Sequence, residues 1–416
     1  MTDSPVIDLA CRFCSAPVEE SFADLGASPL ANDYLEPEDL IRAETFYPLH
    51  ARVCSHCFLV QLPEVARPEE IFSEYAYFSS YSESWLDHAR RYVETMTDRL
   101  GLGEDDRVVE IASNDGYLLR WFRDRGIPVL GIEPAANVAA AAENAGIPTR
   151  VRFFGEEVAR ELVDEGVRAD LLVGNNVLAH VPDLNDFVRG LALLLAPGGA
   201  LTLEFPHLQR LVEEGQFDTI YHEHYSYFSF GTAVEVLGTH SLTVFDVEEL
   251  PTHGGSLRIF ARHREQEEPR TRAAVDELLQ REQRAGYRSL DLYRSFASRV
   301  RKAKRRLLRF LLEAKEEGAS IVGYGAPAKG NTLLNYCGVG PDLLDYTVDR
   351  SPHKQGLFLP GTRIPIHPPE RIFETRPDLV WILPWNLTEE IREQMSGVRK
   401  WGGRFFVAVP EVKEIP

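Results

Sequence analysis

Residues 107–119 read Arg-Val-Val-Glu-Ile-Ala-Ser-Asn-Asp-Gly-Tyr-Leu-Leu. The apolar start predicts a buried strand that ends near Glu110, and the small polar residues predict a tight turn before a helix. In this turn, Ser113, Asn114 and Gly116 leave room for a ligand to approach the backbone. The turn lacks the GxGxxG pattern, so it suits a pyrophosphate less well than a ligand without phosphate. The stretch therefore predicts a strand–turn–helix unit with a small ligand at the carboxyl end of the strand.

Three further segments extend this unit into an α/β domain. A second strand ends in Gly-Ile-Glu133-Pro, whose carboxylate can accept hydrogen bonds from both hydroxyls of a ribose. A third strand ends in the amides Asn175 and Asn176, and a Pro-Gly-Gly turn at 197–199 precedes a fourth. Acidic strand ends suit S-adenosylmethionine (AdoMet), which carries a sulfonium and no phosphate. We therefore predict an AdoMet-binding domain, and the alternative is a generic Rossmann-like domain.

The pattern of apolar runs divides the chain into three predicted domains of an α/β protein. Residues 1–68 are predicted to be a small N-terminal zinc-binding domain. The order of strands, turns and helices in residues 69–263 resembles that of class I AdoMet methyltransferases and implies such a domain, to which residues 69–98 form a helical lead-in. Residues 264–416 are predicted to be a C-terminal helical segment followed by a Rossmann-like α/β domain. Strands are predicted at 107–111, 129–132, 171–174, 200–205, 242–247 and 257–261, and in the last domain at 320–324, 344–348, 379–382 and 405–409.

Four of the five cysteines form two CxxC pairs, Cys11 with Cys14 and Cys54 with Cys57. A two-residue gap lets both thiolates of a pair bind one ion, and four thiolates complete a closed tetrahedron around Zn²⁺. Such a site stabilises the fold and leaves no open position for a substrate. A redox pair of dithiols and a chance arrangement are the alternatives. The spacing therefore predicts a structural zinc ion.

The net charge and the distribution of apolar residues exclude some classes of function. The 416 residues include 45 Lys+Arg and 64 Asp+Glu, which gives a formal net charge of −19. This charge argues against nucleic-acid binding, which needs a basic surface. No apolar stretch approaches the roughly 20 residues that span a bilayer, and no apolar signal core follows the N-terminus. We therefore expect a cytoplasmic protein with neither a membrane nor a nucleic acid as partner.

A cluster of ring-bearing side chains marks the predicted catalytic region. Residues 221–229 read Tyr-His-Glu-His-Tyr-Ser-Tyr-Phe-Ser. Histidine titrates near neutral pH, so a histidine here can act as a base while Glu223 and Tyr221 orient it or stabilise an oxyanion. A His-x-His metal pair and an aromatic core are the alternatives.

Two glycine turns are candidate substrate contacts. Residues 252–258 read Thr-His-Gly-Gly-Ser-Leu-Arg and bring His253, Ser256 and Arg258 toward a substrate, cofactor or phosphate, unless they form an ordinary strand entry. Residues 320–332 form a strand, a glycine turn and a helix start, where backbone N–H groups and Lys329 can hold an anion. This second turn predicts a nucleotide-diphosphate site, with a vestigial Rossmann fold or a second dinucleotide as alternatives. Further candidates for the same cleft are Arg363, His367, Trp381 and Trp385.

Taken together, the motifs resemble those of the sugar C-methyltransferases: the CxxC pairs, EIASNDGYLL, GIEP, NNVLAHVPD, YHEHYSYFS, THGGSLR and GYGAPAKGNTLLN. The similarity runs nearly end to end and is greatest to enzymes that methylate C-3 of dTDP-linked 4-ketosugars in antibiotic deoxysugar biosynthesis. It implies three domains, with the acceptor in the cleft between them. It also implies that His224 is the base, with Tyr221, Glu223 and a tyrosine of 74–78 nearby. Tyr75 is favoured for that tyrosine, and Tyr77 and His222 are then candidate substrate contacts.

The implied reaction explains these residue types. A C–H beside the C-4 ketone can lose its proton to a neutral histidine, and Tyr221 or His180 can donate to the oxygen of the resulting enolate. The carbon then attacks the AdoMet methyl group in line. Methylation at C-5 fits the same logic, and an O- or N-methyltransferase or a non-catalytic binding module are the other function classes. The expected partner is a dTDP-linked 4-ketosugar, and the sequence is compatible with a monomer without fixing the oligomeric state.

Overall fold

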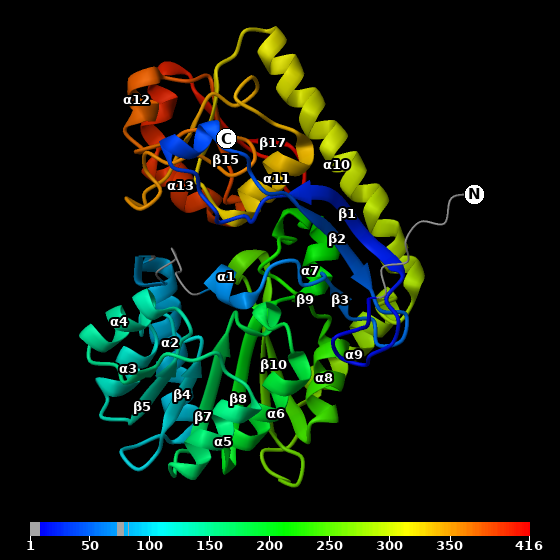
Figure 1. Ribbon diagram of the computed structural model, residues 1–416, viewed down its shortest axis with the longest axis vertical. Coiled ribbons are helices and arrows are strands. Elements are labelled where there is room, and N and C mark those ends of the chain that lie inside the picture. The colour runs from blue at the N-terminus through cyan, green and yellow to red at the C-terminus, as the bar shows by residue number, and fades with distance from the viewer. Residues whose placement is uncertain (1–8, 73–78, 82) are drawn as a thin grey trace.

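The computed structural model describes residues 9–72, 79–81 and 83–416, which form three β-sheets. Figure 1 shows the central sheet in the lower half, the C-terminal part in the upper half, and the N-terminal strands beside both. The long helix α10 (Leu290–Glu316) runs along one side and connects the lower and upper parts (Figure 1). The predicted α/β class with three distinct parts is therefore confirmed.

The central sheet has seven strands in the order β10-β11-β8-β7-β4-β5-β6. The strands are parallel except β11, which is antiparallel to both of its neighbours. The strands β5 and β6 lie on the β4 side of the β7–β4 pair, whereas β8, β11 and β10 lie on the β7 side. Ligands are therefore expected beyond the carboxyl ends of β7 and β4, where the strand order changes direction. All six predicted strands are present. The seventh strand, β6, was not predicted, because two residues are too few to show an apolar run or an alternation. The bounds are β4 (Val108–Ile111), β5 (Val129–Ile132), β6 (Thr149–Arg150), β7 (Ala169–Asn175), β8 (Leu195–Pro206), β10 (Leu242–Leu250) and β11 (Ser256–His263).

Alternating residues of the central strands pack against helices on opposite faces, as the two-residue period of a strand requires. On one face, Val108, Leu171 and Val173 contact α2 and α3. On the other face, Val109 and Leu172 belong to the core formed with α5, α6 and α8. The helices of this part are α2 (Glu83–Leu100), α3 (Leu119–Arg123), α4 (Ala136–Asn144), α5 (Glu156–Asp164), α6 (Leu184–Leu194), α7 (Leu208–Glu214) and α8 (Phe230–Thr239).

The N-terminal sheet takes one strand from the predicted catalytic region. Its order is β1-β2-β3-β9, all antiparallel, with β1 (Glu20–Ser28), β2 (Tyr47–Val53), β3 (Val60–Gln61) and β9 (Ser226–Tyr227). Val60 pairs with Tyr227, and Gln61 pairs with Ser226. The short helix α1 (Pro68–Phe72) leads from this sheet toward the central domain. The strand β9 therefore fixes the 221–229 segment against the N-terminal domain.

The C-terminal sheet has the order β14-β13-β12-β15-β16-β17 and is parallel except for β17. Its strand order changes direction between β12 and β15, as in a Rossmann-like domain. The predicted strand at 344–348 is reduced to two residues, because Leu344 closes a turn onto Gly340. The elements are α9 (Ala273–Ala285), β12 (Ile321–Tyr324), α11 (Ala328–Cys337), β13 (Thr347–Val348), β14 (Ile366–His367), α12 (Arg371–Thr375), β15 (Leu379–Ile382), α13 (Thr388–Gln394), β16 (Arg404–Val407) and β17 (Lys413–Ile415).

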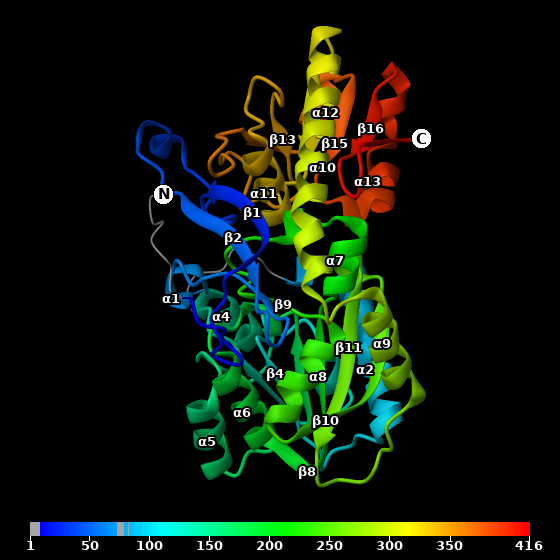
Figure 2. The same cartoon turned by 90° about the vertical axis from the view of Figure 1, so that its right-hand side faces the viewer.

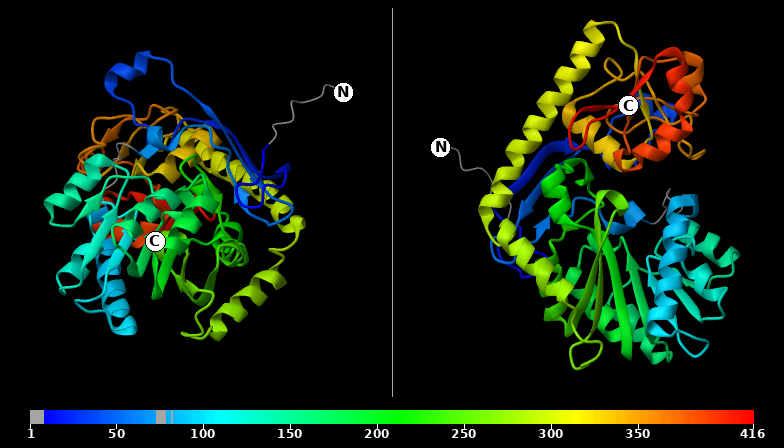
Figure 3. Two further views of the ribbon diagram at one scale, coloured as in Figure 1. Left: turned by 60° about the horizontal axis from the view of Figure 1, so that its bottom comes forward. Right: turned by 180° about the vertical axis from the view of Figure 1, so that it is seen from behind.

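Helix α10 packs along the N-terminal sheet and continues beside the C-terminal domain (Figures 2 and 3). Phe22 of β1 stacks on Phe296 of α10 with ring centroids 4.5 Å apart, and both side chains belong to a core that includes the C-terminal strands. This shared core joins the N- and C-terminal parts. No helix within the described ranges is both long enough and apolar enough to cross a bilayer.

Candidate active site

The predicted cofactor residues lie at the carboxyl ends of β7, β4 and β5, which are neighbours in the sheet. Glu110 is fully buried, and burial raises its pKa well above the usual value while a hydrogen bond from Tyr117 partly opposes this. Glu133 accepts the backbone N–H groups of Asn114 and Ala135, both at 2.9 Å. The carboxylate of Glu133 therefore holds the loop after β4 in place.

The loops after β4 and β7 adopt backbone conformations that few side chains tolerate. The φ angles of Ala112, Asn114 and Asn176 are 55°, 50° and 53°. Gly116 has φ 73°, and a Cβ there would lie 2.8 Å from Cγ1 of Ile147. Such strain persists only where the surroundings enforce it, and it is concentrated at functional sites.

Four buried side-chain oxygens at these loops have no hydrogen-bond partner among the residues that the structure describes. They are Ser113 Oγ, Asp115 Oδ1, Asn175 Oδ1 and Asn176 Oδ1. Burying a polar atom without a partner costs free energy unless a ligand satisfies it. Oxygen acceptors of this kind match the ammonium and ribose hydroxyl groups of AdoMet, so the residues present fit this cofactor.

The lead-in segment covers the loop after β4. The backbone N–H of Ser79 donates to Asn114 Oδ1 at 2.8 Å, and that of Ser80 donates to Asp115 Oδ2 at 3.1 Å. Tyr75 and Tyr77 lie outside the described residues, so their assignment to the acceptor stays a prediction.

His224 is 8% exposed, and its Nδ1 lies 2.9 Å from the carbonyl oxygen of Thr219. A carbonyl oxygen can only accept, so Nδ1 carries the proton and Nε2 keeps its lone pair. Burial lowers the pKa of His224 well below its usual value, and electrostatic repulsion between the protonated forms of His224 and His180 lowers it further. At neutral pH the ring is therefore uncharged and has a basic nitrogen.

His180 and Tyr221 both lie against His224. Their ring centroids are 4.8 Å and 4.0 Å from that of His224, respectively. His180 belongs to the one-turn helix Leu178–His180, which follows Asn175 and Asn176 at the end of β7. Burial lowers the pKa of His180 to about 4, so its ring is neutral too. The structure thus brings three predicted catalytic residues together beside the loops after β4 and β7. These two loops carry predicted AdoMet-binding residues and are called the cofactor loops below.

Glu223 and His222 contact the N-terminal domain. Glu223 accepts a hydrogen bond of 2.6 Å from Nδ2 of Asn32, and His222 donates from Nε2 to the carbonyl of Pro48 at 3.2 Å. His222 and His224 therefore contact carbonyl groups of different domains. Their proposed contacts with the acceptor remain predictions.

Arg258 is buried in a network of ion pairs. Its guanidinium lies 2.7 Å from Glu204 and 3.3 Å from Glu248. Glu204 also accepts hydrogen bonds from His88 at 3.0 Å and from the Thr252 hydroxyl at 2.9 Å. Burial acts to raise the pKa of Glu204, but His88 and Arg258 outweigh it and lower the value to about 2. The network holds the turn that begins at Thr252, and a phosphate contact of Arg258 stays a prediction.

His253 is the residue of this turn that faces the cofactor loops. Its φ is 54°, and its Nε2 lies 3.3 Å from Nδ2 of Asn176. Burial lowers the pKa of His253 to about 4, and the charge of Lys329 adds to the effect. Ser256 donates its hydroxyl hydrogen to the carbonyl of Thr252 at 3.0 Å, so it stabilises the turn.

Lys329 extends from α11 of the C-terminal domain toward the central domain. Its Nζ donates to Asn386 Oδ1 at 2.6 Å and lies 4.5 Å from the centre of the Trp385 ring. Burial lowers the pKa of Lys329 to about 8, partly offset by Asp218. The charge of Lys329 lowers the pKa of both His224 and His253, so the lysine lies near the predicted catalytic residues.

The glycine turn after β12 is occupied by groups of the protein itself. Asp349 accepts the backbone N–H of Ala326 at 2.8 Å, and the Ala326 carbonyl accepts from the Tyr34 hydroxyl at 2.5 Å. Asn331 donates to the carbonyl of Ala31 at 2.6 Å. The acidic strand end and the turn are therefore used for contacts within the chain, which argues against a second dinucleotide at this turn.

Three of the other cleft candidates lie elsewhere. Trp381 is fully buried against Phe406, Arg363 binds the carbonyls of Leu40 and Arg42, and His367 packs against Tyr346. Trp381 is absent from the cleft because it belongs to the core of the C-terminal domain. Arg363 is absent from it because it binds a loop of the N-terminal domain, which the sequence pattern did not locate. Trp385 does face the central domain.

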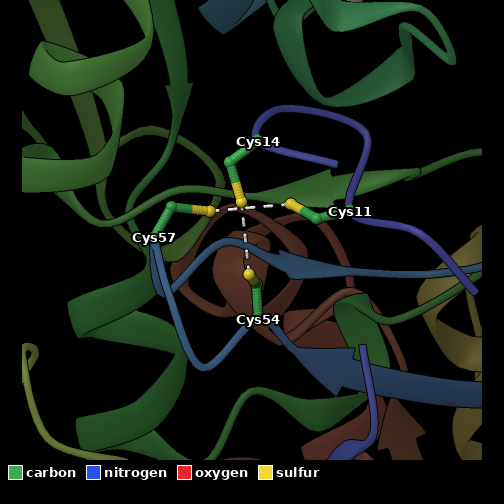
Figure 4. A group of neighbouring side chains, drawn as sticks. All are labelled: Cys11, Cys14, Cys54 and Cys57. Carbon is green, nitrogen blue, oxygen red and sulfur yellow. Dashed lines mark hydrogen bonds between the residues drawn. The ribbon is translucent and has the colours of Figure 1, made fainter. Parts of the chain in front are cut away.

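The four cysteines converge on one point (Figure 4). Their sulfur atoms all lie within 4.8 Å of one another, with 3.5 Å between Cys11 and Cys57 and 3.6 Å between Cys14 and Cys54. Zn–S bonds of about 2.3 Å in a tetrahedron place the sulfurs about 3.8 Å apart, whereas a disulfide needs about 2.05 Å. Gln61 donates a hydrogen bond to the Cys11 sulfur at 3.2 Å. The four cysteines form a zinc-binding site, and no disulfide joins their sulfur atoms.

The two CxxC turns have matching backbones. Ser15 and Phe58, each directly after the second cysteine of a pair, both have φ 61°. The N–H of Ser15 bonds to the carbonyl of Cys11, as that of Phe58 does to the carbonyl of Cys54. The side chain of Arg12 in the first turn donates to the carbonyls of Pro182 and Leu62. The zinc site therefore anchors the N-terminal domain on the loop that follows His180.

Sequence reasoning did not single out His88, Glu204 or Asp218 as site residues. None of these three residues belongs to a recognisable motif. His88 lies within helix α2 and Glu204 within strand β8. One signal for Glu204 was present in the sequence, because it is a charged residue in an otherwise apolar strand. A charged side chain is buried only when it has partners, so this position indicates a buried polar network.

Comparisons with known proteins agree with this arrangement. Residues 11–72 match the family model of a zinc binding domain, 85–237 that of a methyltransferase domain, and 251–410 that of the C-methyltransferase C-terminal domain. The chain is 37% identical over 405 residues to the C-methyltransferase NovU of Streptomyces niveus, covering 97% of this chain and 96% of that protein. The protein belongs to the C-methyltransferase family and is an AdoMet-dependent enzyme.

More distant similarities cover a smaller part of the chain. A ubiquinone biosynthesis O-methyltransferase of Rhodopseudomonas palustris is 29% identical over 117 residues, which are 28% of this chain and 46% of that protein. A solved AdoMet-dependent methyltransferase of Clostridium acetobutylicum has 11% identity and a TM-score of 0.35, covering 43% of this chain and 92% of that one.

Proposed function

We propose that this C-methyltransferase methylates C-3 of a dTDP-linked 4-keto-deoxysugar, through an enolate, in the biosynthesis of an antibiotic deoxysugar. The observation that carries the proposal is the state of His224. Its Nδ1–H is bound to the carbonyl of Thr219, and burial keeps the ring neutral. A neutral buried imidazole next to the AdoMet loops suits the removal of a proton from carbon.

The proposed reaction has two steps. First, Nε2 of His224 takes the proton from C-3, and the electron pair of the C–H bond moves into an enolate with its charge on the C-4 oxygen. Tyr221 or His180 donates a hydrogen bond to this oxygen. Second, C-3 attacks the methyl carbon of AdoMet, the bond from methyl to sulfur breaks, and S-adenosylhomocysteine leaves. The proton stays on His224 until it is lost to solvent.

In this proposal the C-terminal domain recognises the nucleotide end of the acceptor. Lys329 provides the positive charge for the diphosphate, and Trp385 beside it provides an apolar surface. The zinc ion takes no part in the reaction, because four thiolates complete its coordination.

Two alternatives to this reaction differ in the atom that receives the methyl group. Methylation at C-5, the other carbon beside the ketone, needs the same base and the same oxyanion donor. An O- or N-methyltransferase needs no acidic carbon, and the family match to C-methyltransferases argues against it. We therefore keep C-5 methylation as the second candidate.

The test uses the whole protein in D₂O with AdoMet and a panel of dTDP-4-keto-6-deoxysugars that differ at C-3. We expect a product heavier by one CH₂, with NMR placing the new methyl group at C-3. A methyl group at C-5 would establish the alternative. Binding of AdoMet without deuterium uptake or methylation of any ketosugar would contradict the proposed substrate class.

A further inference from the structure

Trp385 joins the C-terminal domain to the segment that orients His224. Its indole Nε1–H donates to Asp218 Oδ2 at 2.7 Å, and Asp218 is completely buried. Trp385 follows β15 of the C-terminal sheet, whereas Asp218 belongs to the one-turn helix Phe217–Thr219 of the central domain. This hydrogen bond therefore crosses between two domains within the core of the protein.

The one-turn helix leads directly to the base. Thr219 follows Asp218, and its carbonyl is the acceptor for Nδ1–H of His224. The turn is also closed by the Thr219 hydroxyl, which donates to the carbonyl of Gln216 at 2.7 Å. A shift of Asp218 would move the carbonyl that fixes both the tautomer and the direction of the imidazole.

The same indole packs against the turn that carries His253. A Cβ on Gly254 would lie 2.3 Å from Cη2 of Trp385, so only glycine allows this approach. The carbonyl of Gly254 accepts a hydrogen bond of 2.7 Å from Gln216, the residue that precedes the one-turn helix. Trp385 thus contacts both turns that present histidines to the cofactor loops.

We propose that Trp385 and Asp218 are positioning residues, which make the orientation of His224 depend on the docked C-terminal domain. The proposal rests on the function proposed above for His224 as the base. It explains why a residue of the nucleotide-recognising domain is hydrogen-bonded to a carboxylate deep in the methyltransferase domain. The C-terminal domain then has a second task besides binding, because proton removal requires its contact.

Several titratable groups face His224 and are kept unchanged in the test. They are His180 from the end of β7, His253 from the turn after β10, Lys329 from α11, and Tyr221 and Tyr227 from its own segment. Replacing Trp385 by Phe removes the N–H donor and keeps a ring beside Lys329 and Gly254. Trp401→Phe is the matched control, since Trp401 donates to the carbonyl of Pro377 at 3.0 Å in the same domain, away from His224.

The first measurement needs no acceptor. Histidine-labelled protein is studied by ¹⁵N NMR over pH 4–8, with the His224 signals assigned from His224→Gln. In the parent protein and in Trp401→Phe we expect a single tautomer with the proton on Nδ1. In Trp385→Phe we expect a mixture of tautomers, because the Thr219 carbonyl no longer fixes the proton on Nδ1. Identical His224 spectra in Trp385→Phe and Trp401→Phe would overturn the proposal.

The second measurement follows deuterium uptake and methylation of the ketosugar. Misplacing a catalytic group can cost on the order of 100-fold in rate, so Trp385→Phe should lower kcat for both reactions by that order. Its KM for AdoMet should stay unchanged. Asp218→Asn, which keeps an oxygen acceptor for the indole, should retain more activity than Asp218→Leu. Equal losses in the two Asp218 variants, with folding checked by circular dichroism, would contradict a positioning role. If the parent protein is inactive on every ketosugar, the proposed substrate fails, while the NMR result still decides this inference.

Discussion

The imidazole of His224 is bound through Nδ1 to the main-chain oxygen of Thr219, and no side-chain acceptor takes that place. A carboxylate at this position would raise the basicity of the ring and favour its protonated form. A carbonyl fixes the tautomer without adding a charge. Together with burial, it keeps Nε2 available as a base over a wide range of pH.

Replacing His224 by Ala should reduce methylation by a factor on the order of 10² to 10⁴, the usual contribution of a general base. AdoMet binding, measured by calorimetry, should be unchanged, because the unpartnered oxygens of the cofactor loops remain. His240→Ala is the control, since His240 bonds to Asn185 on the outer side of the central domain. Turnover of His224→Ala close to that of the control would show that His224 is not the base.

The acid limb of the pH profile should lie below the range of an ordinary histidine. Burial lowers the pKa of His224, so the folded protein keeps this ring neutral as the pH falls through 6.5. We therefore expect kcat/KM to hold between pH 7 and 6, where Lys329 keeps its charge, and to fall on the acid side only below pH 6. An apparent pKa at or above 6.5 in free enzyme, with protein stability checked at each pH, would contradict this expectation.

Acid should also weaken the fold through His180. Its pKa is lowered to about 4 in the folded chain from 6.5 in the unfolded chain. Between these values the unfolded state binds a proton that the folded state does not, so the free energy of unfolding decreases as pH falls from 6.5 to 4. Urea unfolding of the parent protein and of His180→Asn across this window measures the difference. A pH dependence that is identical in the two proteins would argue that His180 titrates normally.

Zinc should be required for stability and not for chemistry. Cys54→Ser should lose the metal, as measured by elemental analysis, because three thiolates no longer close the tetrahedron. The melting temperature should fall markedly, since Cys54 and Cys57 lie fully buried in the core shared with the central domain. Cys337→Ser, which changes a buried cysteine far from the cluster, should keep its zinc.

Substitutions at two glycines with similar backbone conformations can distinguish the cost of backbone strain from the cost of steric overlap. Gly116 and Gly126 have φ 73° and 78°, but only at Gly116 would a Cβ meet another residue, 2.8 Å from Ile147. Gly126→Ala should cost about 1–2 kcal/mol from the left-handed conformation alone. Gly116→Ala should cost about 1–3 kcal/mol more and should weaken AdoMet binding. Equal effects on stability and on the affinity for AdoMet would mean that the loop after β4 can adjust.

Local patterns predicted the three-part fold well. The central strands are short, apolar and bounded by turns, so 107–111 and 129–132 were recognisable, and the CxxC spacing indicated one metal site. The strand β9 was not predictable, because Ser226 and Tyr227 pair with β3, which lies far away in the sequence. A two-residue strand carries no period, and its existence depends on tertiary contacts.

The site was predicted at the level of segments rather than contacts. The 221–229 motif lies beside the loops after β4 and β7, but the sequence could not show that His224 faces His180 while His222 faces Pro48. Likewise, Arg258 is an isolated cation in the sequence and a partner of Glu204 and Glu248 in the fold. The burial and the orientation of a side chain depend on residues far away in the sequence, so a single motif cannot predict them.

The strand β9 has a consequence for how the chain is made. The ribosome delivers β1, β2 and β3 early, but the edge of β3 has no partner until residues 226 and 227 emerge. An open strand edge is a template for pairing with other chains. The zinc turns, which hold the N-terminal segment from both sides, can stiffen it during this interval. The 221–229 segment therefore supplies the closing strand of the N-terminal sheet, so pairing of this sheet and placement of the segment that carries His224 occur together.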